Sequence, residues 1–265
     1  MKIQFTTIAA AVAIAMSTAA AAQTDGSDSS IYQDGQYNEN EITQSGQNAS
    51  RVDQIGTYNA TTVRQDSVDN DSGIRQGGNG NNAEVYQNGL ENASTVSQEG
   101  EENAAIIAQN DDSHVSVSQQ NGMNNAIEVD QRGSLNDSYV YQGGAYNETN
   151  VRQNGLDNTS VAQSFGDGNV TSVDQSSEYN DSYSSLVGNN NEVTVTQNGN
   201  ALESTILASG NHNMHTVTQS GDPHDSYINT AGDHNVHTVA QRNFDAHTSV
   251  INTTGSHNTN SVTQR

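Results

Sequence analysis

Hydrophobic and polar residues alternate along this chain in short stretches that repeat. Residues 81–100 read NNAEVYQNGLENASTVSQEG, in which the order Val-x-Gln-x-Gly occurs at Val85, Gln87 and Gly89 and again eleven residues later. A side-chain period of two is that of a β-strand, and glycine is typical of a turn that needs positive φ. The stretch therefore predicts strands at 81–87 and 92–98, each followed by a turn.

The same unit tiles the chain from Ser27 to Arg265. With Asn81 as position 1, the hydrophobic residue is at position 5, glutamine at 7 and glycine at 9. Units alternate between two series, so the complete period is about 22 residues. In the strict series, position 5 is always Val or Ile. Its position 1 is Asn38, Asn59, Asn81, Asn103, Asn125, Asn147, Asn169, Asn191, Asn213, Asn235 and Asn258, and its position 7 is Gln44, Gln65, Gln87, Gln109, Gln131, Gln153, Gln175, Gln197, Gln219, Gln241 and Gln264.

The other series is looser at position 7. Glutamine is assigned there at Gln33, Gln54, Gln76, Gln98, Gln119 and Gln142, and the pattern slips by one residue at Gln163. Leu186, Ala208, Thr230 and Asn252 follow in the same place. We expect this series, after Gln163, to form the less stable part of the fold.

Charged residues distinguish the two faces of each predicted strand. All seven arginines fall on even positions, and positions 3, 5 and 7 hold no Asp or Glu in any unit. An unpaired buried charge is very costly, so the odd positions are predicted to face inward and the even positions to face water. The predicted turn glycines at position 9 are Gly35, Gly46, Gly56, Gly89, Gly100, Gly133, Gly155, Gly199 and Gly221.

These units predict an all-β fold, a β-solenoid of two stacked sheets. Each coil is a strand, a turn, a second strand and a second turn, and about eleven coils stack at about 4.8 Å. Equivalent residues then form columns. A primary amide carries both a donor and an acceptor, so columns of Asn or Gln can satisfy themselves along the axis, whereas carboxylates would repel.

The amino-acid composition excludes several classes of function. Only 31% of the residues are hydrophobic, cysteine is absent and the formal net charge is -23. The negative charge argues against a nucleic-acid partner, and the lack of cysteine excludes disulfides and thiolate metal sites. No Gly-x-Ser-x-Gly, His-Glu-x-x-His or phosphate-loop motif occurs. The sequence therefore predicts neither an enzyme nor a cofactor.

Seven of the eight histidines lie from His212 onward, and the intervals from His212 to His234 and from His215 to His237 predict stacking one coil apart. A metal-binding or pH-sensitive column is one interpretation. Spacers in a variable column are the favoured one, because no acid or thiolate completes a closed metal site. No metal ligand is assigned.

The N-terminal segment has the pattern of a secretory signal peptide. Lys2 precedes an apolar stretch from Ile8 to Met16 and a small-residue run that ends at Ala22. We expect a signal peptide at 1–22, a short segment at 23–26 and a repeat solenoid at 27–265, working outside the cytoplasm. No cap is evident at either end of the repeats, so open strand edges are expected to attract another molecule.

The repeat resembles that of the curlin family, the subunits of curli fibres on bacterial surfaces. Ser27, Gln33, Gly35, Asn38 and Gln44 fit the family pattern Ser-x5-Gln-x-Gly-x2-Asn-x-Ala-x3-Gln, with Asn40 in the place of its Ala. The resemblance implies an extracellular subunit that is exported through an outer-membrane pore with its accessory proteins. It also implies polymerisation into an amyloid fibre, with a second curlin-type subunit as partner, for adhesion to host or abiotic surfaces and biofilm formation.

This chain departs from the common family form in three ways. It has about twice the usual number of repeats, it lacks the Gly-rich N-terminal segment of the major subunit, and Tyr37, Tyr58 and Glu91 replace the second turn glycine. Two other interpretations stay open: a monomeric extracellular binding solenoid, and the stalk of an adhesin. A binding solenoid is disfavoured because the even positions are varied, and a stalk because neither a membrane anchor nor a translocation domain is evident.

Overall fold

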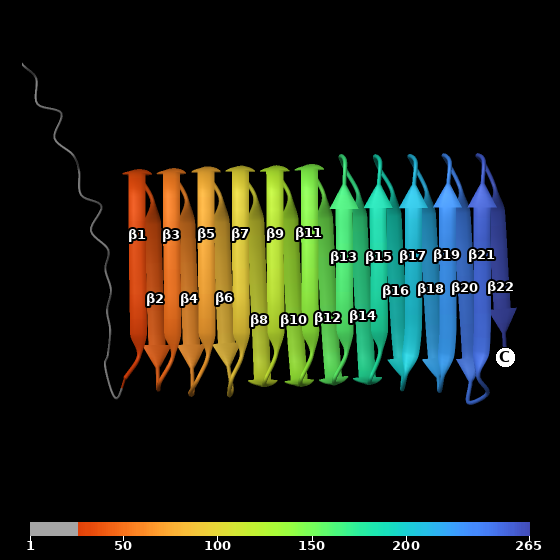
Figure 1. The fold of residues 1–265 in the computed structure, drawn as a ribbon, viewed down its shortest axis with the longest axis horizontal. Coiled ribbons are helices and arrows are strands. Elements are labelled where there is room, and N and C mark those ends of the chain that lie inside the picture. The colour runs from red at the N-terminus through yellow and green to blue at the C-terminus, as the bar shows by residue number, and fades with distance from the viewer. Residues whose placement is uncertain (1–25) are drawn as a thin grey trace, which may run out of the picture.

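The structure is a computed structural model that describes residues 26–265, and within this range it is made only of strands and short connections (Figure 1). The predicted signal peptide and residues 23–25 lie outside the described residues. No helix in the described part of the chain is long and apolar enough to cross a membrane.

Twenty-two strands form two sheets of eleven strands each, and the chain passes from one sheet to the other after every strand. Sheet A contains β1 (Asp28–Gln36), β3 (Ala49–Thr57), β5 (Asp71–Asn79), β7 (Ala93–Glu101), β9 (Val115–Met123), β11 (Asp137–Ala145), β13 (Thr159–Phe165), β15 (Asp181–Val187), β17 (Leu202–Ser209), β19 (His224–Ala231) and β21 (His247–Thr254).

Sheet B is formed by the alternate strands, which lie behind sheet A in Figure 1. It contains β2 (Glu39–Ser45), β4 (Ala60–Asp66), β6 (Asn82–Asn88), β8 (Ala104–Asp112), β10 (Ala126–Ser134), β12 (Glu148–Leu156), β14 (Val170–Glu178), β16 (Glu192–Gly199), β18 (Met214–Gly221), β20 (Val236–Asn243) and β22 (Thr259–Gln264). The predicted β-solenoid of eleven coils is therefore confirmed.

Neighbouring strands within each sheet are parallel and in register, so equivalent residues of successive coils lie over one another. Val63 pairs with Val85, and Val85 with Ile107. Most steps are 22 residues, as from Asn81 to Asn103. The step from Asn38 in the first coil to Asn59 in the second is 21 residues. The step from Asn235 to Asn258 in the last coil is 23 residues, because the connection from β20 to β21 is longer.

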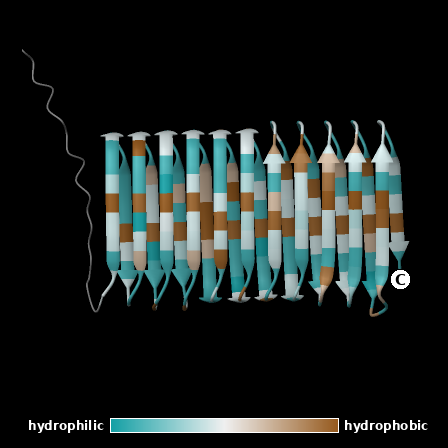
Figure 2. Ribbon diagram, viewed as in Figure 1, coloured by the Kyte–Doolittle hydropathy of each residue, from teal (hydrophilic) through white to brown (hydrophobic). Residues whose placement is uncertain are grey.

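The interior is narrow and is filled from both sheets. Odd positions are buried and even positions are largely exposed: in β6, Ala83, Val85 and Gln87 are buried, whereas Tyr86 is exposed. Most position-5 residues join one hydrophobic cluster, seen in Figure 2 as brown bands near the middle of the strands, whereas Ser118 and Ser184 take this position in β9 and β15. Polar residues outnumber hydrophobic ones among the buried side chains. The fold therefore depends on hydrogen bonds between coils as well as on apolar burial.

Candidate functional site

Asparagine at position 1 of sheet B forms a column through the whole stack. The backbone N and Nδ2 of Asn81 both donate to Oδ1 of Asn59 at 3.1 Å, and its Nδ2 also donates to the Gly100 carbonyl at 3.0 Å. One side chain thus ties three successive coils together. The same amide bond occurs at every step from Asn38 to Asn258.

Glutamine at position 7 of sheet B forms a second column. Gln87 Nε2 donates to Gln109 Oε1 at 2.9 Å and to the Asp71 carbonyl of sheet A at 3.0 Å. Each step from Gln44 to Gln264 has an amide bond of 2.7 to 3.0 Å. These side chains are buried except for Gln44 and Gln264 in the two end coils. An unpaired amide is costly only when it is buried, so the partly exposed end residues carry little penalty.

The two columns run in opposite directions. In the bonds between side-chain amides, glutamine donates toward the C-terminal coil, whereas asparagine donates toward the N-terminal coil. Within residues 26–265, the glutamine column ends with the Nε2 of Gln264 as donor and begins with the Oε1 of Gln44 as acceptor. The asparagine column begins at Asn38 and ends at Oδ1 of Asn258, so the two end coils of the described stack are complementary.

The glutamine column of sheet A covers only the first six coils. It joins Gln33, Gln54, Gln76, Gln98, Gln120 and Gln142 at 2.8 to 3.1 Å. The residues that continue this position are Ser164, Leu186, Ala208, Thr230 and Thr253.

Two of the residues predicted for this column, Gln119 and Asn252, do not lie in it, so their assignment is wrong. Gln98 pairs with Gln120, and Gln119 faces outward beside Ser97, because the strand must be counted from His114, which occupies position 1 in place of Asn. Asn252 also faces outward, beside Asn229, because the connection after β20 is one residue longer. At the slip noted for Gln163, the strand keeps its register and Ser164 takes the inward position.

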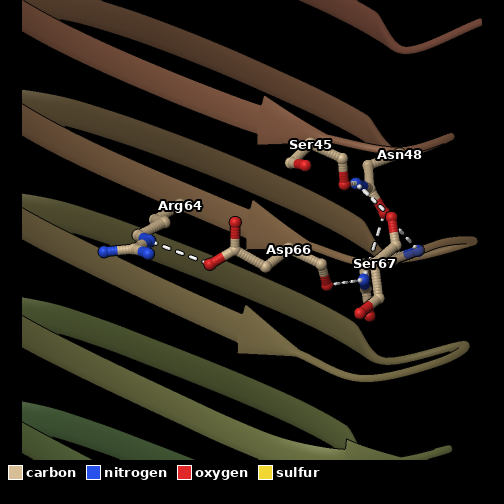
Figure 3. Close-up of polar contacts among 6 residues, drawn as sticks. Ser45, Asn48, Arg64, Asp66 and Ser67 are labelled. Atoms are coloured by element: carbon tan, nitrogen blue, oxygen red, sulfur yellow. Dashed lines mark hydrogen bonds and ion pairs between the residues drawn. The ribbon is translucent and has the colours of Figure 1, made fainter. Parts of the chain in front are cut away.

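Position 1 of sheet A uses the same bonds with more variation. Asn48 Nδ2 donates to the Ser45 carbonyl at 2.9 Å in its own turn and to the Ser67 carbonyl of the next coil at 3.0 Å (Figure 3). Arg64 and Asp66 lie outside this junction as an exposed ion pair of 2.9 Å, which contributes little to stability. The asparagine bonds continue to Asn180, with His114 inserted, and end at Leu202.

A serine column at position 3 of sheet A was missed from the sequence. In every strand from β3 to β21 this residue is a buried serine: Ser50, Ser72, Ser94, Ser116, Ser138, Ser160, Ser182, Ser204, Ser226 and Ser249. None of these hydroxyls has a hydrogen-bond partner among the described residues. The sequence pattern that could have revealed it is a serine two residues after position 1 in each unit of this series. Because that serine never varies from β3 to β21, the sheet A series is irregular at position 7 but strict at position 3.

Residues seven apart face each other across a coil and compensate in size. Gln54 Nε2 bonds Thr61 Oγ1 at 3.1 Å, and Asn260 Nδ2 bonds Thr253 Oγ1 at 3.0 Å. In the same relationship, the small residues Ala208 and Thr230 are matched to His215 and His237. The imidazoles therefore occupy interior space that glutamine fills in the first six coils.

Eight of the nine assigned turn glycines have positive φ, between 97° at Gly46 and 146° at Gly155. Gly199 does not, so the expectation of positive φ is wrong there, although a Cβ on it would lie 1.9 Å from the Gly221 carbonyl oxygen. Sheet A has glycine at position 9 in all eleven coils, including the unassigned Gly78 and Gly122. Tyr37 has φ of 58°, so the replaced second turn glycines keep a left-handed backbone.

The histidines stack in three columns. The ring centroids of His212 and His234 lie 4.8 Å apart on the surface, and those of the buried His215 and His237 lie 5.2 Å apart. His224 and His247 are stacked at 5.1 Å. Burial and the neighbouring His237 lower the pKa of His215 to about 4, and burial lowers the pKa of His237. Among residues 26–265, no group of three or more His, Asp or Glu is placed to hold a metal ion.

The arrangement defines a class: a parallel β-solenoid in which amide columns join the coils. Residues 122–155 and 188–221 match the model of the curlin associated repeat. These segments contain Asn125, Gln131 and Gly133 of the sheet B columns and their counterparts Asn191 and Gln197. These two segments of the chain are thus similar to the curlin repeat, and the match supports assignment of the chain to the curlin-repeat family. No curated protein matches the chain.

Proposed function

We propose that this protein is an exported structural subunit that stacks end to end into an amyloid fibre at the cell surface. One observation carries the proposal: the two end coils of the described stack have complementary edges. Gln264 and Asn258 of one copy match Gln44 and Asn38 of the next, as each coil matches its neighbour within the chain. Parallel, in-register strands perpendicular to the long axis are the arrangement of cross-β fibres.

The matching of end coils extends beyond the amides. Val262 in β22 is equivalent to Ile42 in β2, and Ser249 in β21 to Ser29 in β1. Sheet A is less well matched, because Thr253 would meet Gln33. Sheet B therefore supplies the continuous contact in the proposed junction. A second curlin-type subunit would dock through the same match of Asn and Gln columns. The similarity to the curlin repeat supports the further proposals of export through an outer-membrane pore and of roles in adhesion and biofilm formation.

The test is growth of fibres by the purified protein after dilution from denaturant, with and without preformed seeds. We expect growth that seeds accelerate and a fibre-diffraction reflection at about 4.7 to 4.8 Å along the fibre axis. The Val262→Asp variant places a charge at an inward position of the last strand and is expected to stop growth, whereas Thr263→Asp faces outward and should not. A β-rich monomer that ignores seeds would favour the monomeric binding solenoid instead.

A further inference from the structure

The outer surface of sheet A changes its chemistry along the stack. In β1 to β7 the outward positions 4, 6 and 8 include Asp34, Arg51, Asp53, Arg75 and Glu99. From β9 to β21 the same positions, beginning with residues 117, 119 and 121 and ending with residues 250, 252 and 254, contain no charged residue. We call these twenty-one positions the neutral face. In a protein of net charge -23, seven consecutive strands of a sheet with no charge at positions 4, 6 and 8 form a distinct surface.

Tyrosines recur on the neutral face at every second strand. Tyr139, Tyr183 and Tyr227 occupy position 4 of β11, β15 and β19, and the pairing register places Val161 and Thr205 between them. Strands in a sheet are spaced by about 4.8 Å, so these tyrosines are about 10 Å apart along the stack. Strand propensity explains tyrosine and valine on a sheet surface but not this alternation.

The tyrosine side chains lie partly against the sheet. The hydroxyl of Tyr183 donates to Gln163 Oε1 on β13 at 3.3 Å, so the ring leans across position 6 of the neighbouring strand. Tyr183 itself is 36% exposed, whereas Tyr139 and Tyr227 are half-buried. The rings therefore offer a flat apolar surface with amide groups beside them.

A shallow hollow of about 360 Å³ lies at the N-terminal end of the neutral face. It is lined by Tyr141, Phe165 and Gly143, with Gln119 and Asn121 on one side. A Cβ on Gly143 would lie 3.2 Å from Phe165 Cδ1, so the phenylalanine ring covers the glycine directly. Aromatic walls and neutral amides thus also characterise the hollow.

We propose that the neutral face binds a neutral, extended β-1,4-linked polysaccharide, with Tyr139, Tyr183 and Tyr227 stacked on its sugar rings. Aromatic rings pack on the apolar face of a pyranose, and amides donate to and accept from its hydroxyls. In such a polymer every second sugar presents the same face, which corresponds to a ring on every second strand. Binding at this surface does not depend on fibre formation.

The carboxylates beside the neutral face favour a neutral polysaccharide over a charged one. Asp137, Asp181, Glu203 and Asp225 at position 2 border the neutral face, so a polyanionic polysaccharide would be repelled. A second copy docked face to face would oppose two such rows of carboxylates and bury the amides of Gln119 and Asn252 without assured partners. The neutral polysaccharide is the occupant that avoids both costs.

The test is co-sedimentation of the purified protein with microcrystalline cellulose, compared with retention on insoluble cross-linked polygalacturonate. We expect binding to cellulose alone. The triple variant Tyr139→Thr, Tyr183→Thr and Tyr227→Thr should bind at least about tenfold more weakly, since each aromatic contact accounts for about two- to tenfold in affinity. Replacing the same three residues by Phe keeps the rings and should preserve binding.

A matched control removes three tyrosines from the turns instead. Tyr37→Asn, Tyr58→Asn and Tyr146→Asn leave the neutral face unchanged, and Asn accepts the positive φ at these positions, so binding should persist. Circular dichroism establishes that each variant is folded. Equal binding to both polymers, no binding to cellulose, or full binding by the folded Thr variant would overturn the proposal. Loss of lateral association without loss of cellulose binding in the Thr variant would assign the tyrosines to a second copy.

Discussion

Gln119 and Gln120 are adjacent in β9 but lie on opposite sides of sheet A. Gln120 is buried, accepts a hydrogen bond from Gln98 at 2.9 Å and donates one to Gln142 at 3.1 Å, whereas Gln119 faces the solvent. The same substitution at these two positions therefore separates the effect of the column from that of strand propensity.

We expect Gln120→Leu to lower the free energy of unfolding by about 1–3 kcal/mol, because it leaves polar atoms of Gln98 and Gln142 without their amide partner in the interior. Gln119→Leu should change it by less than about 0.5 kcal/mol. Urea unfolding followed by circular dichroism measures both. Equal destabilisation by the two variants would show that the amide column adds nothing specific.

Gly78 and Gly77 provide a second pair of neighbours. Gly78 has φ of 111°, and a Cβ on it would lie 2.0 Å from the carbonyl oxygen of Gly100, whereas the nearest atom to a Cβ on Gly77 is 3.9 Å away. We expect Gly78→Ala to destabilise by at least about 2 kcal/mol through backbone strain and the clash. Gly77→Ala should be neutral or slightly stabilising. The difference in urea midpoint between the variants is the measurement, and a tolerated Gly78→Ala would contradict this close approach of coils.

The buried histidines predict sensitivity of the C-terminal coils to acid. The pKa of His215 falls from 6.5 to about 4 in the folded chain, so the unfolded chain binds protons more readily. Stability from this group is complete above pH 6.5 and is lost as the pH falls through about 4. Along the stack His215 meets Val193 and His237, and across the coil Ala208 and Thr230, so no carboxylate compensates the charge.

Amide hydrogen exchange at pH 7 and at pH 4.5 checks this expectation. After correction for the intrinsic pH dependence of exchange, protection of β18 and β20 should decrease in acid more than that of β4 and β6. The double variant His215→Asn and His237→Asn should remove the difference, because Asn40 and Asn260 already occupy this position in other coils. His212→Asn with His234→Asn, which alters an exposed stack, is the control. Uniform loss of protection along the chain would refute a local effect of these residues.

The shortened glutamine column of sheet A predicts a gradient of stability. We expect amides in β15, β17 and β19 to exchange faster than those in β3, β5 and β7, since the second group alone has continuous glutamine bonds at position 7. Sheet B is the internal reference, because its columns are unbroken. Removal of coils from the C-terminal side should accordingly harm assembly less than removal of the first six coils, and the opposite ranking would exclude the columns as the main source of stability.

The period-two pattern was sufficient to predict the strands, the number of coils and the inward face of most strands, because each is a local property of the repeat. The register of individual strands was harder to predict from the sequence. Gln119 and Asn252 were misplaced because His114 hid a unit start and because the turn before His247 gained a residue. The serine column and the pairing of Ala208 with His215 depend on which residues face each other across a coil. The neutral face emerges only when strands far apart in sequence are laid side by side.

The opposite directions of the Asn and Gln columns have an electrostatic consequence for a long stack. Aligned peptide dipoles in a helix add up to partial charges at its ends. Here the positive ends of the glutamine amides point toward the C-terminal coil and those of the asparagine amides toward the N-terminal coil. The two columns oppose each other, and the strands, which run across the stack axis, point in opposite directions in sheet A and sheet B. Each further coil therefore adds almost no macrodipole, and the field at the tip of such a stack is independent of its length.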